Sequence, residues 1–219
     1  MELNGKKMVF LGDSITEGCG TSSLEHVYWN VIGQQTGAKV FGYGIGGTRI
    51  APQRVPTVER PWEDRHFASR VDEMEPGADV VVIFGGTNDF GHGDAAFGTV
   101  KDMTEDTFCG SVHVLIRKVM ERYPNAKIVI MTPMHRLSED ETYYNEQGVR
   151  RVGNLERYVN TMKEIAGFYG LPTVDLFHNC PIQPKVEAMR EKFMPDGLHP
   201  NDAGNLLIAR CLMNVLKEL

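Results

Sequence analysis

The feature that most restricts the fold is the run Asp79-Val80-Val81-Val82-Ile83-Phe84, in which every residue after the aspartate is apolar. A strand with one face in water alternates polar and apolar side chains, whereas this run is apolar on both faces. Strands of that kind lie at the centre of parallel sheets, where helices cover both sides. The run therefore predicts a buried, central parallel strand.

Four other short runs have strand character, and segments with helical spacing separate several of them. The expected strands cover residues 7–11, 39–41, 79–84, 127–131 and 172–176. Apolar residues recur at helical spacing from Phe108 to Tyr123, from Val152 to Ala166 and over residues 202–218. This alternation predicts an α/β fold with a five-stranded parallel sheet and helices on both faces. Residues 49–70, rich in Arg and Pro, are expected to be irregular and to pack over the sheet edge.

Length and composition fit a single globular domain over residues 1–219, with 42% hydrophobic and 24% charged residues. A formal net charge of −6 with no basic patch argues against nucleic-acid binding. The apolar stretch Met8–Leu11 is short for a signal peptide, and no apolar run is long enough to span a membrane. Four scattered cysteines without a CxxC pair are expected to be reduced thiols, and the localisation is expected to be cytoplasmic.

Ligands of open parallel sheets bind outside the carboxyl ends of the strands, so chemistry is sought in loops 12–20, 44–50, 85–94, 132–150 and 193–201. In the first of these loops, Ser14 follows a strand and opens a helix, as either a nucleophile or an ordinary helix N-cap does. The chain has no G-x-S-x-G elbow. The glycine-rich segment 42–47 either brings backbone N–H groups to an oxyanion or forms a plain tight turn.

The loop after the central strand holds Asn88, which is either an oxyanion donor or a loop-capping residue, and Asp89, which is expected to be a structural acceptor. Asp196 precedes His199 by three residues, a spacing that lets a carboxylate orient an imidazole as general base. Asp89 and His92 have the same spacing, so spacing alone leaves the two pairs equal.

His135 follows an expected strand and either lines the pocket or lies on the surface, and His92 is interpreted as a substrate-pocket or plain loop residue. The remaining histidines show no metal-ligand spacing, so no metal site is expected.

Together, Gly12-Asp13-Ser14, the glycine loop, Gly86-x-Asn88 and Asp196-x-x-His199 resemble the SGNH hydrolases, also called the GDSL esterase/lipase family. The resemblance runs from residue 8 to about residue 210 and implies a flavodoxin-like, three-layer α/β sandwich. It implies that Ser14 is the nucleophile, His199 the base and Asp196 the residue that orients it. The implied oxyanion donors are the N–H groups of Ser14 and Gly47 and the Asn88 amide. Gly42, Tyr43 and Gly44 stand where the family often has an Asn, so Gly46 remains the alternative to Gly47, and Ile15 replaces the family's Leu.

The resemblance implies a serine esterase that needs no metal or organic cofactor. Its small-molecule substrate is expected to be an acylated sugar, a short-chain ester or a lysolipid. The alternatives are a thioesterase or an amide or activated-ester hydrolase of the same fold, and a catalytically silent binding module. The silent module is disfavoured because Ser14, Asn88, Asp196 and His199 are all present. The sequence does not fix the oligomeric state. Four arginines indicate a polar or anionic substrate or a solvated surface: Arg49, Arg54, Arg60 and Arg65.

Overall fold

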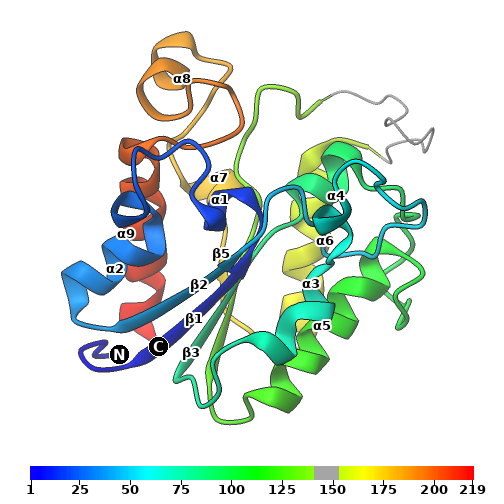
Figure 1. The fold of residues 1–219 in the computed structure, drawn as a ribbon, viewed down its shortest axis with the longest axis horizontal. Helices are drawn as coiled ribbons and strands as arrows, with labels where there is room; N and C mark the ends of the chain where they lie inside the picture. The colour runs from blue at the N-terminus through cyan, green and yellow to red at the C-terminus, as the bar shows by residue number, and fades with distance from the viewer. Residues whose placement is uncertain (141–152) are drawn as a thin grey trace.

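The structure is a computed structural model that describes residues 1–140 and 153–219. Within these ranges, one parallel sheet of five strands forms the centre of the molecule, in the order β2-β1-β3-β4-β5 (Figure 1). The predicted α/β fold with a five-stranded parallel sheet is confirmed. The strands are β1 Lys7–Gly12, β2 Lys39–Gly44, β3 Val80–Phe84, β4 Lys127–Met131 and β5 Thr173–Val174.

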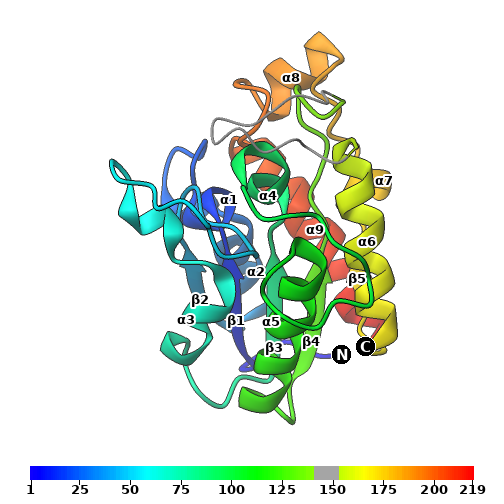
Figure 2. The same ribbon diagram turned by 90° about the vertical axis from the view of Figure 1, so that its right-hand side faces the viewer.

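Helices cover both faces of the sheet and complete three layers (Figures 1 and 2). One face carries α2 (Tyr28–Thr36) and α9 (Asp202–Glu218). The other carries α3 (Phe67–Arg70), α5 (Phe108–Arg122) and α6 (Leu155–Phe168). The shorter helices and 3-10 turns are α1 Ser14–Glu17, α4 Thr87–His92, α7 Leu176–Asn179, α8 Glu187–Phe193, η1 Leu24–His26, η2 Pro61–Asp64 and η3 Val71–Glu73.

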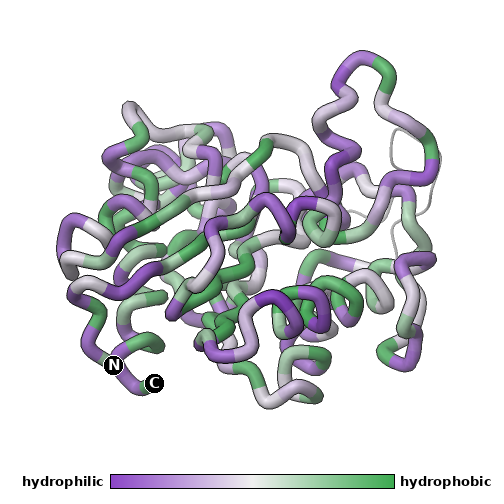
Figure 3. Tube along the Cα trace, turned by 60° about the horizontal axis from the view of Figure 1, so that its bottom comes forward, coloured by the Kyte–Doolittle hydropathy of each residue, from purple (hydrophilic) through white to green (hydrophobic). Residues whose placement is uncertain are grey.

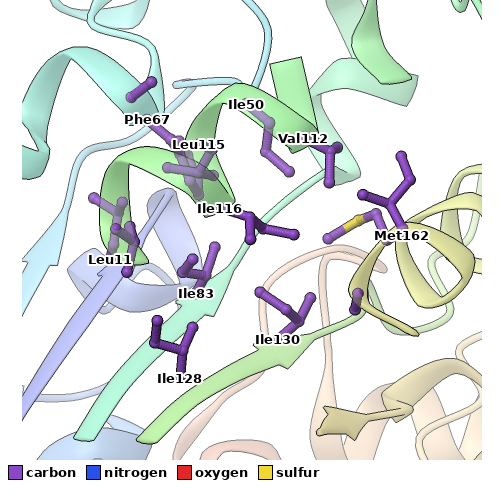
Figure 4. Close-up of a cluster of buried hydrophobic side chains, with 14 of the residues drawn as sticks. Leu11, Ile50, Phe67, Ile83, Val112, Leu115, Ile116, Ile128, Ile130 and Met162 are labelled. Carbon is purple, nitrogen blue, oxygen red and sulfur yellow. The ribbon is translucent and has the colours of Figure 1, made fainter. Parts of the chain in front are cut away.

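Alternate side chains of each strand enter different cores, as the pleat of a strand requires. In β1, Val9 and Leu11 join the core under α5 and α6, whereas Met8 and Phe10 join the core under α2 and α9. Figure 4 shows the first of these cores, with side chains of α5 lying over those of the strands. Green, hydrophobic stretches run through the middle of the trace in Figure 3. Each fully buried large apolar side chain contributes roughly 1.5–3 kcal/mol, so the two cores fix the sheet between its helices.

Several elements differ from the sequence-based expectations. β5 has two residues instead of five, because Asp175 caps α7 and Leu176 already lies in that helix. Helix α2 was not predicted. Residues 49–70 are not wholly irregular, since they contain η2 and α3, but they do reach the sheet edge through contacts with β2. Residues 141–150 of the expected loop 132–150, and Val152 of the expected helix, lie outside the described residues.

Residues 1–140 and 153–219 contain neither a membrane-spanning helix nor a cluster of metal ligands. None of their helices has the length and apolar character of a membrane span. Across the same ranges, no group of three or more His, Cys, Asp or Glu side chains is placed to hold a metal ion. Cys19, Cys109, Cys180 and Cys211 are free thiols.

Candidate active site

The sheet register brings three loops to one level at the carboxyl ends of neighbouring strands. Gly12, the last residue of β1, lies opposite Gly44 of β2 and opposite Phe84 of β3. Because β1 lies between β2 and β3, the segments that follow these residues are neighbours in space. The segment after β1 carries Ser14, the segment after β2 carries the glycine turn, and the segment after β3 carries Asn88.

Ser14 opens α1 directly after β1. The Asp13 carboxylate accepts a hydrogen bond from the N–H of Ile15 at 3.0 Å and so caps the helix. Gly12 has no room for a side chain, because a Cβ there would lie 1.9 Å from Oγ1 of Thr16. This tight junction between strand and helix places Ser14, which is 7% exposed, at the carboxyl edge of the sheet.

The Ser14 hydroxyl meets an oriented histidine from the far end of the chain. Oγ of Ser14 lies 3.0 Å from Nε2 of His199, and Nδ1 of His199 lies 2.7 Å from Oδ2 of Asp196. Oδ1 of Asp196 also accepts from the N–H groups of Leu198 and His199, at 2.8 and 2.7 Å. The carboxylate therefore fixes the ring orientation and favours a proton on Nδ1, which leaves Nε2 to accept from the serine.

The ionisation of Asp196 suits this role. Partial burial raises the pKa of the carboxyl, but the two backbone N–H groups and the imidazole outweigh burial and hold the pKa below its ordinary value. Asp196 therefore stays charged at neutral pH, and a negative charge remains beside the His199 ring.

The glycine segment after β2 forms a tight turn. The carbonyl of Ile45 accepts from the N–H of Thr48 at 3.3 Å and from its hydroxyl at 2.7 Å, which leaves Gly46 and Gly47 at the centre. Gly47 has φ +76°, as the third position of a type II turn requires, and a Cβ there would lie 2.4 Å from Cδ of Glu63. Within the described residues, neither the Gly46 nor the Gly47 N–H donates a hydrogen bond, so both are available to a ligand.

Asn88 lies in the first turn of α4 and is tied to the glycine turn. One N–H of its side-chain amide donates to the carbonyl of Thr48 at 3.0 Å. The amide carries a second N–H. Asn88 is 5% exposed, and this single contact orients its amide at the edge where Ser14 and Gly47 lie.

The second Asp-x-x-His pair does not form a dyad. The Asp89 carboxylate accepts from the N–H groups of Ile50 and Ala51, each at 2.9 Å, which confirms the expected structural role. Nδ1 of His92 instead lies 2.9 Å from Nη1 of Arg49. Since a guanidinium only donates, Nδ1 is the acceptor and the His92 proton is on Nε2.

His135 lines a small cavity, with room for about one water molecule, beside the candidate site residues. Asp13, Thr87 and Leu198 also line it, and these are the sequence neighbours of Ser14, Asn88 and His199. The ring of His135 stacks at 3.9 Å on Phe177, and its Nδ1 lies 2.8 Å from a carboxylate oxygen of Glu139. His135 is therefore held rigidly next to the site, whereas His92 does not line this cavity.

The four arginines noted in the sequence all contact groups of the chain itself. Arg49 is 1% exposed, so the interpretation as solvated surface is wrong for it. Its guanidinium donates to the carboxylate of Asp64 and the carbonyl of Glu63, at 3.0 and 2.9 Å. The other three contact the Asp106 carbonyl (Arg54), the Glu63 carboxylate (Arg60) and the Glu73 carboxylate (Arg65).

Two buried residues next to the site were missed by the sequence analysis. Arg70 contacts the ends of β1 and β2, and Thr48 joins Arg70 to Asn88. The only available signal was the position of Thr48 directly after the glycines. Arg70 gave none, because charged residues are mostly exposed and the sequence does not mark exceptions.

Comparisons with known proteins were made for the sequence and the structure. The sequence matches the GDSL-like Lipase/Acylhydrolase family over residues 10–207. No curated protein sequence matches. One crystal structure shares 31% identity, with a TM-score of 0.83, and the match covers 100% of this chain and 99% of the other. A protein from Lactobacillus plantarum shares 25% identity, with a TM-score of 0.81 and 98% of each chain covered. The chain is also similar to a two-domain esterase active on acetylated mannans and co-crystallised with mannopentaose. That similarity has 25% identity and a TM-score of 0.60, over 99% of this chain and 50% of the other.

Proposed function

The chain belongs to the GDSL-like lipase/acylhydrolase family and is a hydrolase of ester bonds, and from this premise we propose that residues 1–219 form one serine esterase domain with Ser14 as nucleophile. The observation that supports the proposal is the continuous contact from Ser14 Oγ to His199 Nε2 at 3.0 Å and from His199 Nδ1 to Asp196 at 2.7 Å. A neutral hydroxyl needs such a base, and the base needs such an acid to hold it.

The reaction has two steps. His199 Nε2 takes the hydroxyl proton as Ser14 Oγ attacks the ester carbonyl, and Asp196 stabilises the imidazolium that forms. When the tetrahedral intermediate collapses, the imidazolium gives its proton to the departing alcohol and an acyl-serine remains. Water, deprotonated by the same histidine, then attacks the acyl-serine, and collapse of the second intermediate returns the proton to Ser14 and releases the acid.

The oxyanion of each intermediate accepts from three N–H donors: the backbone of Ser14, the backbone of Gly47 and the side chain of Asn88. Asn88 can serve because only one of its two amide N–H groups is needed for the Thr48 carbonyl. The Gly47 N–H has the required freedom among the described residues, as does that of Gly46. A preorganised donor of this kind is worth about 2.7–4 kcal/mol in the transition state.

We propose a short-chain ester of a polar alcohol, such as an acetylated sugar, as the substrate class. The cavity beside Asp13, Thr87 and Leu198 has room for only about one water molecule. The site therefore offers no enclosed channel there for a lipid chain, which favours a short acyl group. His135 in the cavity wall, and His92 of α4, are proposed to contact polar atoms of the substrate. The similarity to an esterase active on acetylated mannans supports this class.

A fluorophosphonate probe and an ester series test the proposal together. The wild-type protein should be labelled and the Ser14→Ala variant should not, with an unchanged melting temperature. Hydrolysis should be faster for p-nitrophenyl acetate and acetylated sugars than for p-nitrophenyl palmitate, lysolipid or acyl-CoA. Labelling of Ser14→Ala would refute the nucleophile. Absence of wild-type labelling would favour the silent binding module, and preference for lysolipid or acyl-CoA would refute the substrate class.

A further inference from the structure

A buried arginine lies beneath the proposed oxyanion hole. Arg70, the last residue of α3, is 2% exposed, and its guanidinium stacks 5.0 Å from the centre of the Phe67 ring. Burial lowers the pKa of Arg70 to about 10, so the side chain remains a cation at neutral pH. Burying a cation in a protein core costs free energy unless hydrogen-bond partners compensate for it. The groups that accept from Arg70 therefore indicate what the side chain supports.

Those partners belong to the two strand ends that carry Ser14 and the glycine turn. Nη2 donates to the carbonyl of Gly12 at 3.0 Å, two residues before Ser14, and Nη1 donates to the carbonyl of Tyr43 at 2.8 Å, next to the last residue of β2. The remaining donor, Nε, lies 3.0 Å from the carbonyl of Arg65 and anchors the guanidinium to its own segment. One rigid planar group therefore sets the spacing between the ends of β1 and β2.

Arg70 also contacts the turn itself. Nη2 lies 3.1 Å from Oγ1 of Thr48, the hydroxyl that donates to the Ile45 carbonyl and closes the turn around Gly46 and Gly47. The carbonyl of the same threonine receives the Asn88 amide. Thr48 thus connects Arg70 to the Gly47 N–H on one side and to the Asn88 amide on the other, while the Gly12 contact connects Arg70 to Ser14.

We infer that Arg70 is a positioning residue of the oxyanion hole, which holds the Gly46–Gly47 turn and Asn88 in register with Ser14 through Thr48 and Gly12. The inference rests on the proposed function. A guanidinium suits the task because its donors have fixed directions, whereas a lysine ammonium is a point charge on a flexible stem. Misplacement of donors by about 1 Å can lower a rate about 10²-fold, and donors that act on the transition state affect kcat more than KM.

The test is a double-mutant cycle between Arg70 and Thr48. Arg70→Lys should lower kcat about 10- to 100-fold with little change in KM. Thr48→Val, which removes the hydroxyl that Arg70 contacts, should lower kcat similarly, and Thr48→Ser, which keeps it, should not. In the double variant Arg70→Lys/Thr48→Val the losses should be clearly less than multiplicative, because both changes release the same turn.

Arg122 offers a matched control on the same face of the sheet. Its guanidinium lies 5.5 Å from the centre of the Tyr123 ring and donates to the carbonyl of Met74, yet it makes no described contact with the glycine turn. Arg122→Lys should leave kcat unchanged.

Three results would overturn the inference: unchanged kcat in Arg70→Lys, fully multiplicative losses in the double variant, or unchanged kcat in Thr48→Val. An unchanged kcat in Thr48→Val overturns the inference even if Arg70→Lys does not fold. Failure of the proposed function looks different, because Ser14→Ala would then retain activity whatever the Arg70 variants do.

Discussion

Two segments of this chain have the same Asp-x-x-His spacing, and the fold uses them differently. Asp196 and His199 lie in a turn that Gly197, with φ +77°, allows, and there the carboxylate faces the ring Nδ1 at 2.7 Å. Asp89 and His92 lie in helix α4, where the carboxylate instead accepts from the backbone of residues 50 and 51. The backbone conformation, and not the spacing, decides whether such a pair forms a dyad.

The two pairs also differ in burial and charge. The side chain of Asp196 is 54% exposed, whereas Asp89 is 6% exposed as a residue. Burial raises the pKa of Asp89 to about 6, while hydrogen bonds keep that of Asp196 below its ordinary value. His199 faces the serine and His92 accepts from the Arg49 guanidinium. Asp196 and His199 have the features expected of an oriented general base. Asp89 and His92 instead support the segment that follows the glycine turn.

The largest expected difference between the pairs is in the histidines. His199→Ala should lower kcat on an acetyl ester by about 10⁴-fold or more, as Ser14→Ala should, because nucleophile and base act as a unit. His92→Ala should lose less than about tenfold and mainly raise KM, because a substrate contact affects binding more than chemistry. Steady-state kinetics on both purified variants decide the ranking, and the reverse order would assign the base to His92.

The carboxylates should differ by nearly as much. Asp196→Asn removes the acceptor that holds the proton on Nδ1 of His199, and a loss of about 10³- to 10⁴-fold in kcat is expected with little change in melting temperature. Asp89→Asn should lose less than tenfold in kcat but should lower the melting temperature, because Ile50 and Ala51 donate to different oxygens of Asp89 and one of these oxygens becomes an NH₂ donor. Equal effects on activity would contradict the comparison.

Asn88 lies directly before Asp89 in the same helical turn, and we propose that it donates to the oxyanion whereas Asp89 supports the backbone. Asn88→Ala should lower kcat about 10²- to 10³-fold and leave KM nearly unchanged if its amide donates to the oxyanion. Asn88→Asp should be worse, because it places negative charge where more develops. A purely structural Asn88 would instead reduce the melting temperature while kcat per folded molecule stays at the wild-type value.

The smallest expected effect is on the pH dependence of stability. The folded state keeps the Asp89 proton up to about pH 6, whereas the unfolded chain loses it near 3.8, so the free energy of unfolding should fall by about 2 kcal/mol as the pH rises from 4 to 6. Asp196 has the opposite sign, since its pKa is lowered on folding and its contribution disappears only on acidification below about pH 4.

Urea unfolding from pH 3 to pH 7 separates the two contributions. Asp89→Asn should reduce the decline between pH 4 and 6, and part should remain because burial also raises the pKa of Asp13 to about 6. Asp196→Asn should leave that decline intact and weaken the loss below pH 4. A wild-type stability that rises between pH 4 and 6 would contradict the assignment for Asp89.

The sequence predicted the elements whose apolar pattern is unambiguous and missed those stabilised by context. Strand β4 and helix α9 have the expected bounds, 127–131 and 202–218. Helix α2 was missed because Gly33 interrupts it, its buried residues Tyr28, Val31 and Ile32 form a short pattern, and no side chain caps its start. Its stability comes from packing against α9, which no local pattern reports.

The same limit applies to the candidate site. Ser14, Asn88, Asp196 and His199 were expected from short motifs, and the fold brings Ser14, His199 and Asp196 into contact. The choice between the two Asp-x-x-His pairs could not be made from spacing, because it depends on Arg49 and on the backbone of residues 50 and 51. Arg70 could not be identified, because its partners are carbonyl groups of Gly12 and Tyr43 that only the sheet brings together.

The contact between Ser14 and His199 joins residues that are 185 positions apart in the chain. A ribosome adds about 5–20 residues per second, so roughly 10–40 seconds separate the synthesis of the serine from that of the histidine. During that interval the nascent chain carries the proposed nucleophile without its proposed base. Esterase activity should therefore appear only once the segment containing His199 has left the ribosome exit tunnel and packed against the rest of the fold. The time at which hydrolysis begins would then report when the last folding step is complete.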